Sequence, residues 1–183
     1  VDAATRALHY ERGCFDRTRT NWPDYRILPG RAQDEPLAWM WAWCHGAPGI
    51  GLVRLDALGS RDDPELASDL AAALASTTRF GFGSNDSLCH GDLGNLELLV
   101  RAYELGYRGE WEDALAAHSS RLATRLQEGR WRCGVPGGVE TPGLMTGLAG
   151  IGYGLLRIAA PERVPSLLAL EPPRVMIGVR GGR

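Results

Sequence analysis

Three stretches of the chain align with one another: CHGAPGIGLVRL (Cys44–Leu55), CHGDLGNLELLV (Cys89–Val100) and MTGLAGIGYGLL (Met145–Leu156). Each contains a Gly-x-x-Gly pair followed by apolar residues at helical spacing. Glycine at the start of a helix lets neighbouring backbones approach closely, and repeated helix hairpins stack with equivalent helices side by side. The sequence therefore predicts stacked hairpins whose equivalent helix starts meet at one end of the stack.

The rest of the chain also reads as helical. Asp63 is a predicted N-cap, with Pro64 at the first helical position behind it. Apolar residues recur at helical spacing in four segments, and no stretch of comparable length alternates with period two. These segments are residues 63–80, 93–106, 110–129 and 143–160. Gly, Pro and Asp mark the intervening loops, so the fold class is predicted to be all-α.

Composition sets few limits on function. The chain has 183 residues, 44% of them hydrophobic and 23% charged, with a net charge of −2. These values are ordinary for a globular protein and give no reason to expect a nucleic-acid or membrane-surface partner. No apolar run is long enough to span a membrane, and the N-terminus is not a signal peptide. The four cysteines at 14, 44, 89 and 133 lie far apart, unlike the disulfide framework of a small secreted domain, so we expect a cytoplasmic protein. The missing initiator Met suggests that an upstream part is absent.

Two Cys-His-Gly triplets occupy equivalent repeat positions, at Cys44-His45 and Cys89-His90. Zinc binds cysteine thiolate and histidine nitrogen, with four protein ligands in structural sites and three plus an open position in catalytic sites. Adjacent residues at a helix start point about 100° apart, so all four side chains need not reach one metal. Either a Cys2His2 site or a three-ligand site is possible. The third repeat has Met145 there and supplies no ligand.

The other candidate residues have simpler interpretations. Cys133 and Cys14 are expected to be loop or buried thiols, and His9 and His118 surface or hydrogen-bonded histidines. Asp92 could orient His90 or simply complement a helix dipole. Three alternating tryptophans, Trp39, Trp41 and Trp43, are expected to pack in the interior, although one of them could border a peptide groove. The segment Asn21, Trp22, Pro23 and Asp24 is interpreted as a turn without chemistry.

Four long motifs then resemble a known family. They are ALHYERGCFDRTRTNWPD (residues 7–24), WCHGAPGIGLVRL (43–55), SLCHGDLGNLELL (87–99) and ETPGLMTGLAGIGYGLLRIAAPERVPSLLALEPP (140–173). The chain resembles the LanC-like lanthionine synthetase cyclases, and most of all the C-terminal cyclase domain of class II (LanM-type) lanthipeptide synthetases. By this resemblance, residues 1–173 are the C-terminal portion of a cyclase domain and residues 174–183 are a tail without a family feature.

The resemblance implies part of an α/α toroid, in which Gly-x-x-Gly motifs open the inner helices. It also implies a single Zn2+ held by Cys44, Cys89 and His90, with water in the fourth position. The residue after the first cysteine is often histidine in LanM-type enzymes. His45 therefore corresponds to a cavity residue, a proton donor or substrate positioner, and not to a fourth ligand.

The family reaction adds a peptide cysteine thiol to dehydroalanine or dehydrobutyrine, forming a lanthionine or methyllanthionine thioether. A thiol that coordinates zinc loses its proton, and two thiolate ligands would keep an incoming third one electron-rich. The expected partner is a dehydrated lanthipeptide precursor. The dehydratase domain and the other half of the toroid would lie upstream, so this chain alone is expected to bind zinc but to cyclise poorly or not at all.

Two other readings stay open. Protein prenyltransferases also combine an α/α barrel with a zinc-activated thiol, but their ligand set includes an aspartate, and the sequence offers no convincing one. The alternative to an enzyme is a non-catalytic, zinc-stabilised scaffold that binds peptides. Coordination separates these readings, because a site closed by His45 is structural, whereas three protein ligands and a displaceable water support catalysis.

Overall fold

A computed structural model describes residues 2–26 and 36–173, so the predicted tail at 174–183 lies outside the described residues. Over the described residues the structure contains six α-helices and one short 3-10 helix. The same residues contain three isolated β-bridges but no extended β-strand. The prediction of an all-α fold is confirmed, whereas closure into a toroid stays a prediction. The helices are α1 (Asp2–Gly13), α2 (Ala47–Leu58), α3 (Pro64–Phe80), α4 (Asp92–Glu104), α5 (Trp111–Gln127), η1 (Pro136–Gly138) and α6 (Leu148–Ala159).

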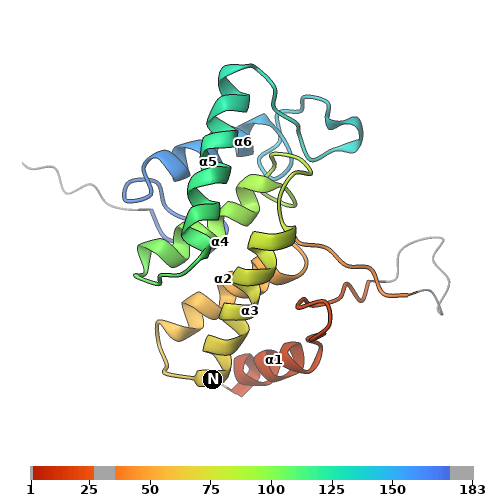
Figure 1. The fold of residues 1–183 in the computed structure, drawn as a ribbon, viewed down its shortest axis with the longest axis vertical. Coiled ribbons are helices and arrows are strands. Elements are labelled where there is room, and N and C mark those ends of the chain that lie inside the picture. The colour runs from red at the N-terminus through yellow and green to blue at the C-terminus, as the bar shows by residue number, and fades with distance from the viewer. Residues whose placement is uncertain (1, 27–35, 174–183) are drawn as a thin grey trace, which may run out of the picture.

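The three repeat helices pack against one another in chain order. Helix α4 contacts both α2 and α6, while α3 packs on α2 and α5 packs on α4. In Figure 1, α4 lies in the middle of the molecule, with α1 to α3 on one side and α5 and α6 on the other. Every residue from Asp92 to Val100 is buried, so α4 is buried on all sides and does not keep the exposed polar face of an amphipathic surface helix. None of the described helices has the length and apolar character needed to cross a membrane.

Equivalent helix starts meet at one end of the stack, as the repeats predict. The backbone N–H of Cys44 donates to the carbonyl of Cys89 at 3.2 Å, and the N–H of Cys89 donates to the carbonyl of Met145 at 2.9 Å. Each of these residues holds the same position in its repeat. One row of backbone hydrogen bonds therefore joins the three repeats immediately before their helices begin.

The second glycine of each repeat is required for the same structural reason. A Cβ atom built on any of the three would lie within 2.0 Å of the backbone carbonyl oxygen six residues earlier, a distance that no side chain tolerates. The three pairs are Gly49 with Trp43, Gly94 with Leu88 and Gly150 with Leu144. The loop before each helix folds back over its first turn, and only glycine leaves room for it.

Two glycines of α6 test this explanation. Replacing Gly150 with alanine forces its Cβ against the Leu144 carbonyl and should lower the free energy of unfolding by about 2 kcal/mol or more. A Cβ on Gly152, one half-turn further, meets nothing within 4 Å, and alanine there should raise the free energy by about 0.5–1 kcal/mol through helix propensity. Urea unfolding of both variants measures the difference. Equal effects of the same sign would show that the loop contact is not what excludes a side chain.

The predicted start of α3 is confirmed and that of α6 is wrong. Asp63 caps α3 by accepting hydrogen bonds from the backbone N–H groups of Glu65 and Leu66 at 2.9 and 3.2 Å. Helix α6 begins at Leu148 and not at residue 143, because Leu148 donates its N–H to the carbonyl of Thr141 at 2.7 Å. The preceding residues form a turn instead, and this turn presents the Met145 carbonyl to the neighbouring repeat.

Candidate metal centre

Three potential metal ligands converge where the repeats meet. The ligand atoms of Cys44, Cys89 and His90 all lie within 4.8 Å of one another, and each residue is partly buried. All three residues precede the first glycine of their repeat, so the backbone bond from Cys44 to Cys89 brings them together. Among the described residues this is the one group of three or more His, Cys, Asp or Glu side chains that could hold a metal ion.

His45 lies outside this cluster and contacts a carboxylate. Its Nε2 atom is 3.8 Å from Oδ1 of Asp24, and its side chain is 24% exposed. Its other ring nitrogen, Nδ1, is buried without a hydrogen-bond partner in the structure. The two Cys-His pairs are therefore unequal in geometry: both members of the second pair join the cluster, but only the cysteine of the first does.

Asp24 is a site residue that the sequence reasoning missed, since residues 21–24 were interpreted as a turn without chemistry. The carboxylate is buried and is held by the guanidinium of Arg26, whose Nη2 lies 2.7 Å from Oδ2. This hydrogen-bonded ion pair lowers the pKa of Asp24 to about 2, so the group that faces His45 is ionised at neutral pH. A positive charge on His45 would be stabilised by this neighbour.

Asn21, from the same segment, fixes the start of α2. The residue is fully buried; its Oδ1 accepts a hydrogen bond from the N–H of Ala47 at 2.8 Å, and its Nδ2 donates to the carbonyl of Met40 at 2.9 Å. The bond from Ala47 satisfies an N–H of the first turn that Gly46 cannot reach with a side chain, and the bond to Met40 holds the amide in place. The loop from residue 21 to 24 therefore sets the position of the Cys44-His45 pair from outside the repeats.

The loop before η1 packs against His90. A Cβ on Gly134 would lie 2.5 Å from Oγ of Ser87 and 2.9 Å from Nε2 of His90, while the Gly134 N–H donates to the carbonyl of Thr146 at 2.7 Å. The neighbouring Cys133 is a buried loop thiol, in line with its expected role. Glycine at position 134 thus allows the loop to lie directly on the imidazole.

Alanine at position 134 should displace His90 and weaken metal binding. Because groups that orient metal ligands contribute about 10- to 100-fold to affinity, we expect the zinc Kd of Gly134→Ala to rise by about tenfold. Competition with a chromophoric chelator measures it. Gly143→Ala is the control, since the nearest atom to a Cβ there is 3.8 Å away. An unchanged Kd for Gly134→Ala would show that the loop does not position the imidazole.

The chemistry of the cluster fits zinc. Two sulfur atoms and one imidazole nitrogen form the soft, borderline donor set that Zn2+ prefers, and three such ligands leave one tetrahedral position for another group. Burial, together with the hydrogen bond to Cys89, raises the pKa of Cys44 to about 12. The Cys44 thiol is thus kept protonated by its surroundings, and a divalent cation would supply the positive charge that a thiolate needs there.

Comparison with known proteins identifies the family. The family model described as lanthionine synthetase C-like protein matches residues 1–169, nearly the whole described chain. The chain belongs to the lanthionine synthetase C-like family. The resemblance found in the sequence motifs is confirmed, and it points to a lanthipeptide cyclase at the level of the family.

One curated protein is similar in sequence to most of this chain. The lacticin 481/lactococcin biosynthesis protein LcnDR2 of Lactococcus lactis subsp. lactis is 28% identical over 155 residues. The match covers 77% of this chain and 16% of the relative, so the chain spans about a sixth of the length of that protein. The similarity to that protein therefore concerns only a part of its length.

The other residues that the sequence singled out lie apart from the cluster. Both carboxylate oxygens of Asp92 are used elsewhere, by the N–H of Gly83 at 2.8 Å and by Nη2 of Arg125 at 2.7 Å, so the idea that Asp92 orients His90 gains no support. His118 stacks on the ring of Phe82 with centroids 3.7 Å apart, and burial lowers the pKa of its imidazole. Three further predicted residues have no part in the cluster: His9 is exposed, Cys14 is half-buried, and Trp41 donates a hydrogen bond to Ser76.

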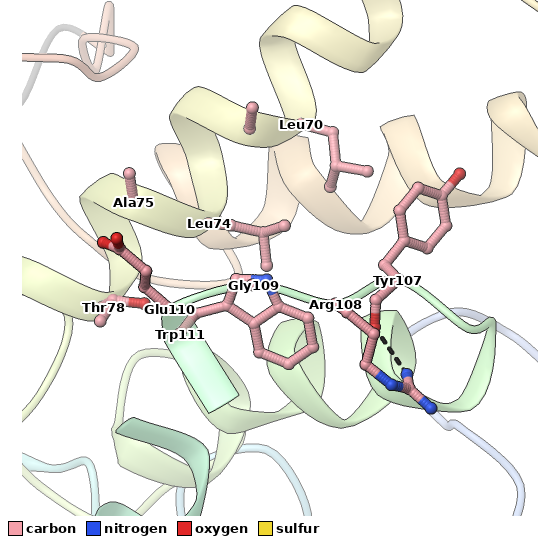
Figure 2. A pocket seen from close by; sticks show the side chains of 10 residues that line it. Leu70, Leu74, Ala75, Thr78, Tyr107, Arg108, Gly109, Glu110 and Trp111 are labelled. Carbon is pink, nitrogen blue, oxygen red and sulfur yellow. Dashed lines mark hydrogen bonds between the residues drawn. The ribbon is translucent and has the colours of Figure 1, made fainter. Parts of the chain in front are cut away.

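Two cavities differ in their relation to the cluster. One of about 550 Å3 lies between α3 and the connection from α4 to α5; its wall is largely apolar, with Trp111 beneath Leu74, and Arg108 donates to the carbonyl of Tyr107 at 2.6 Å (Figure 2). No member of the cluster lines it. A second cavity of about 350 Å3 is bordered by Trp43, Cys44 and His45, and so opens beside the Cys44 side of the cluster.

Proposed function

We propose that this chain contributes the thiol-activating zinc centre of a lanthipeptide cyclase, which joins a peptide cysteine to a dehydroalanine or dehydrobutyrine. One observation carries the proposal: in a member of the lanthionine synthetase C-like family, Cys44, Cys89 and His90 bring three metal-ligand atoms within 4.8 Å. A cluster of two cysteines and one histidine without a carboxylate also disfavours the ligand set of a prenyltransferase.

Cys44 and Cys89 would bind the ion as thiolates and His90 as a neutral imidazole. Zinc held in this way lets a peptide cysteine bind as a thiolate at neutral pH. The thiolates of Cys44 and Cys89 would offset the charge of the ion and so keep the substrate sulfur electron-rich and nucleophilic. This role of the cysteines goes beyond holding a metal, because neutral ligands in their place would leave the substrate sulfur less reactive.

His45 and Asp24 would serve the proton transfer. In the proposed reaction, the peptide thiolate forms a C–S bond to the β-carbon of the dehydro residue, and the π electrons move to an enolate. A proton must then reach the α-carbon. His45 faces the ionised Asp24 at 3.8 Å and borders the cavity beside the cluster. His45 could donate this proton or position the peptide, with Asp24 favouring the charged imidazolium.

The proposed substrate is a precursor peptide already dehydrated at serine or threonine, and the proposed partner is the dehydratase that prepares it. A cytoplasmic setting would suit the centre, because a reducing compartment keeps thiols free, and Cys44 and Cys89 are free cysteines here. The N-terminal part of the toroid and the dehydratase are expected in the full-length protein.

Thioether formation by the full-length protein tests the proposal. The probe is a synthetic peptide with one dehydroalanine and one cysteine, incubated with zinc-loaded protein. Ring closure does not change the peptide mass but removes the thiol, so iodoacetamide labelling followed by mass spectrometry reports it. We expect the labelled peptide to disappear only with zinc-loaded protein. With protein from which a chelator has first removed the zinc, the peptide should stay labelled. A thiol that stays fully labelled, in a protein whose zinc is bound by four protein ligands, would overturn the proposal in favour of a structural zinc scaffold.

A further inference from the structure

A groove extends from the metal centre along the outside of α2. Cys44 and His45 border one end, Val53 lies further along the helix, and residues 168–170, which follow α6, form the opposite wall. Its volume is about 350 Å3, in the lower range of small-ligand sites. The groove is therefore continuous with the cluster and is large enough for one or two amino-acid side chains.

Leu170, at the rim of this groove, has an unusual conformation. Its φ angle is +54° and its side chain is 86% exposed. A left-handed backbone is disfavoured for a leucine, and residues in such conformations concentrate at ligand-binding positions. Because the side chain of Leu170 is exposed, the hydrophobic effect does not compensate for this backbone conformation. The chain therefore presents an apolar side chain beside the metal centre in a conformation that glycine or asparagine would adopt more readily.

Neighbouring bonds hold this conformation in place. The N–H of Leu170 donates to the carbonyl of Leu167 at 3.2 Å, and the N–H of Glu171 donates to the carbonyl of Ser166 at 2.9 Å. Glu171 in turn pairs with Arg101 of α4 at 2.5 Å. The turn is thus anchored to the central helix, and the position of Leu170 is fixed by the fold.

The walls of the groove are mainly apolar. The indole of Trp43 links them by donating a hydrogen bond from Nε1 to the carbonyl of Leu168 at 3.3 Å. Val53 is 51% exposed although it lies on a helix whose neighbouring residues Leu52 and Arg54 are buried. With Leu170, these side chains make most of the lining apolar, while Asp56 lies on α2 and Cys44 and His45 border the groove at the cluster.

We propose that this groove is a specificity subsite that binds an aliphatic side chain of the peptide substrate, next to the cysteine whose thiol reacts. The proposal rests on the proposed function, since it needs a peptide cysteine at the cluster. Consecutive residues are about 3.3–3.6 Å apart in an extended peptide, so a groove that begins at Cys44 receives the residue adjacent to a sulfur held there. Leu170 and Val53 would enclose that side chain.

Binding to the full-length protein tests the subsite without catalysis. Two fluorescent peptides carry serine in place of the reacting cysteine and differ only in the next residue, leucine or serine. We expect the leucine peptide to bind about tenfold more tightly, both with zinc and after its removal by a chelator. In Leu170→Asn this preference should disappear, while asparagine keeps the left-handed turn. Leu156→Asn, at a 60% exposed position of α6, is the matched control and should keep the preference.

Kinetics separate this inference from the proposed function. With reactive versions of the two peptides, Leu170→Asn should raise KM for the leucine peptide about tenfold and leave kcat, zinc content and Tm unchanged. Equal affinities of the two peptides for the unmodified protein would overturn the subsite while thioether formation continues. Absence of thioether from either peptide would instead overturn the proposed function, whatever the binding preference.

Discussion

Replacing Cys89 with alanine is expected to abolish stoichiometric zinc binding by the full-length protein. Structural zinc sites with four ligands are worth about 10–16 kcal/mol, so one ligand contributes on the order of 3 kcal/mol, more than a hundredfold in Kd. Cys89 supplies one of the two thiols in the cluster and is hydrogen-bonded to the other, Cys44. Dialysed protein should fall from about one zinc per chain to a trace by elemental analysis, and cyclisation should be lost with it.

Cys133→Ala provides the matched control for this loss. Cys133 is also a free cysteine and is more deeply buried than Cys89, but it lies outside the cluster. Its removal should leave zinc content near one equivalent, with at most a small decrease in Tm. If Cys89→Ala bound zinc as tightly as the control variant, the ion would have other ligands and the proposed centre would be wrong.

The repeats made the fold and the cluster predictable because both depend on local rules. Helical spacing and glycine pairs predict the hairpins, and stacking of equivalent elements then brings Cys44 next to Cys89 without knowledge of any side-chain contact. The close backbone contacts of the second glycines, such as that of Gly94 with the Leu88 carbonyl, explain why the motif recurs. Geometry of this kind can be inferred from one chain alone, since each repeat carries the same information.

The surroundings of the cluster could not be predicted in this way. Asp24 reaches His45, and Gly134 reaches His90, from loops outside the repeats and far from their partners in sequence. No periodicity describes these contacts, because each depends on how one irregular loop crosses the end of the stack. The left-handed Leu170 is a further case, since its sequence context gives no sign of a positive φ angle.

Arg157→Met is expected to lower the free energy of unfolding by about 3–5 kcal/mol. The guanidinium is 1% exposed and joins α6 to α4, with Nε 3.1 Å from Oε1 of Glu97 and a second contact to Glu104. Nη1 also donates to the carbonyl of Pro161 at 2.8 Å. Removing the cation leaves the buried carboxylate of Glu97 uncompensated, the costly way to break a buried pair. Thermal unfolding should show a decrease in Tm of about 10 °C.

The pH dependence and two further variants identify the cause of this loss. Burial already raises the pKa of Glu97 above its usual value, and loss of Arg157 raises it further. A carboxyl whose pKa is higher in the folded than in the unfolded state destabilises the fold once the pH exceeds the unfolded value. The deficit of Arg157→Met should therefore be smaller at pH 5 than at pH 8.

The double variant Glu97→Leu/Arg157→Met removes both charges and should recover at least half of the lost stability, because an apolar pair of similar volume often replaces a buried ion pair without penalty. Arg121→Met, at an exposed position of α5, should change the free energy of unfolding by less than about 0.5 kcal/mol. A pH-independent deficit that the double variant does not relieve would mean that Arg157 stabilises α6 through its packing and its bond to Pro161. The charge of Glu97 would then contribute little to the contact between the second and third repeats.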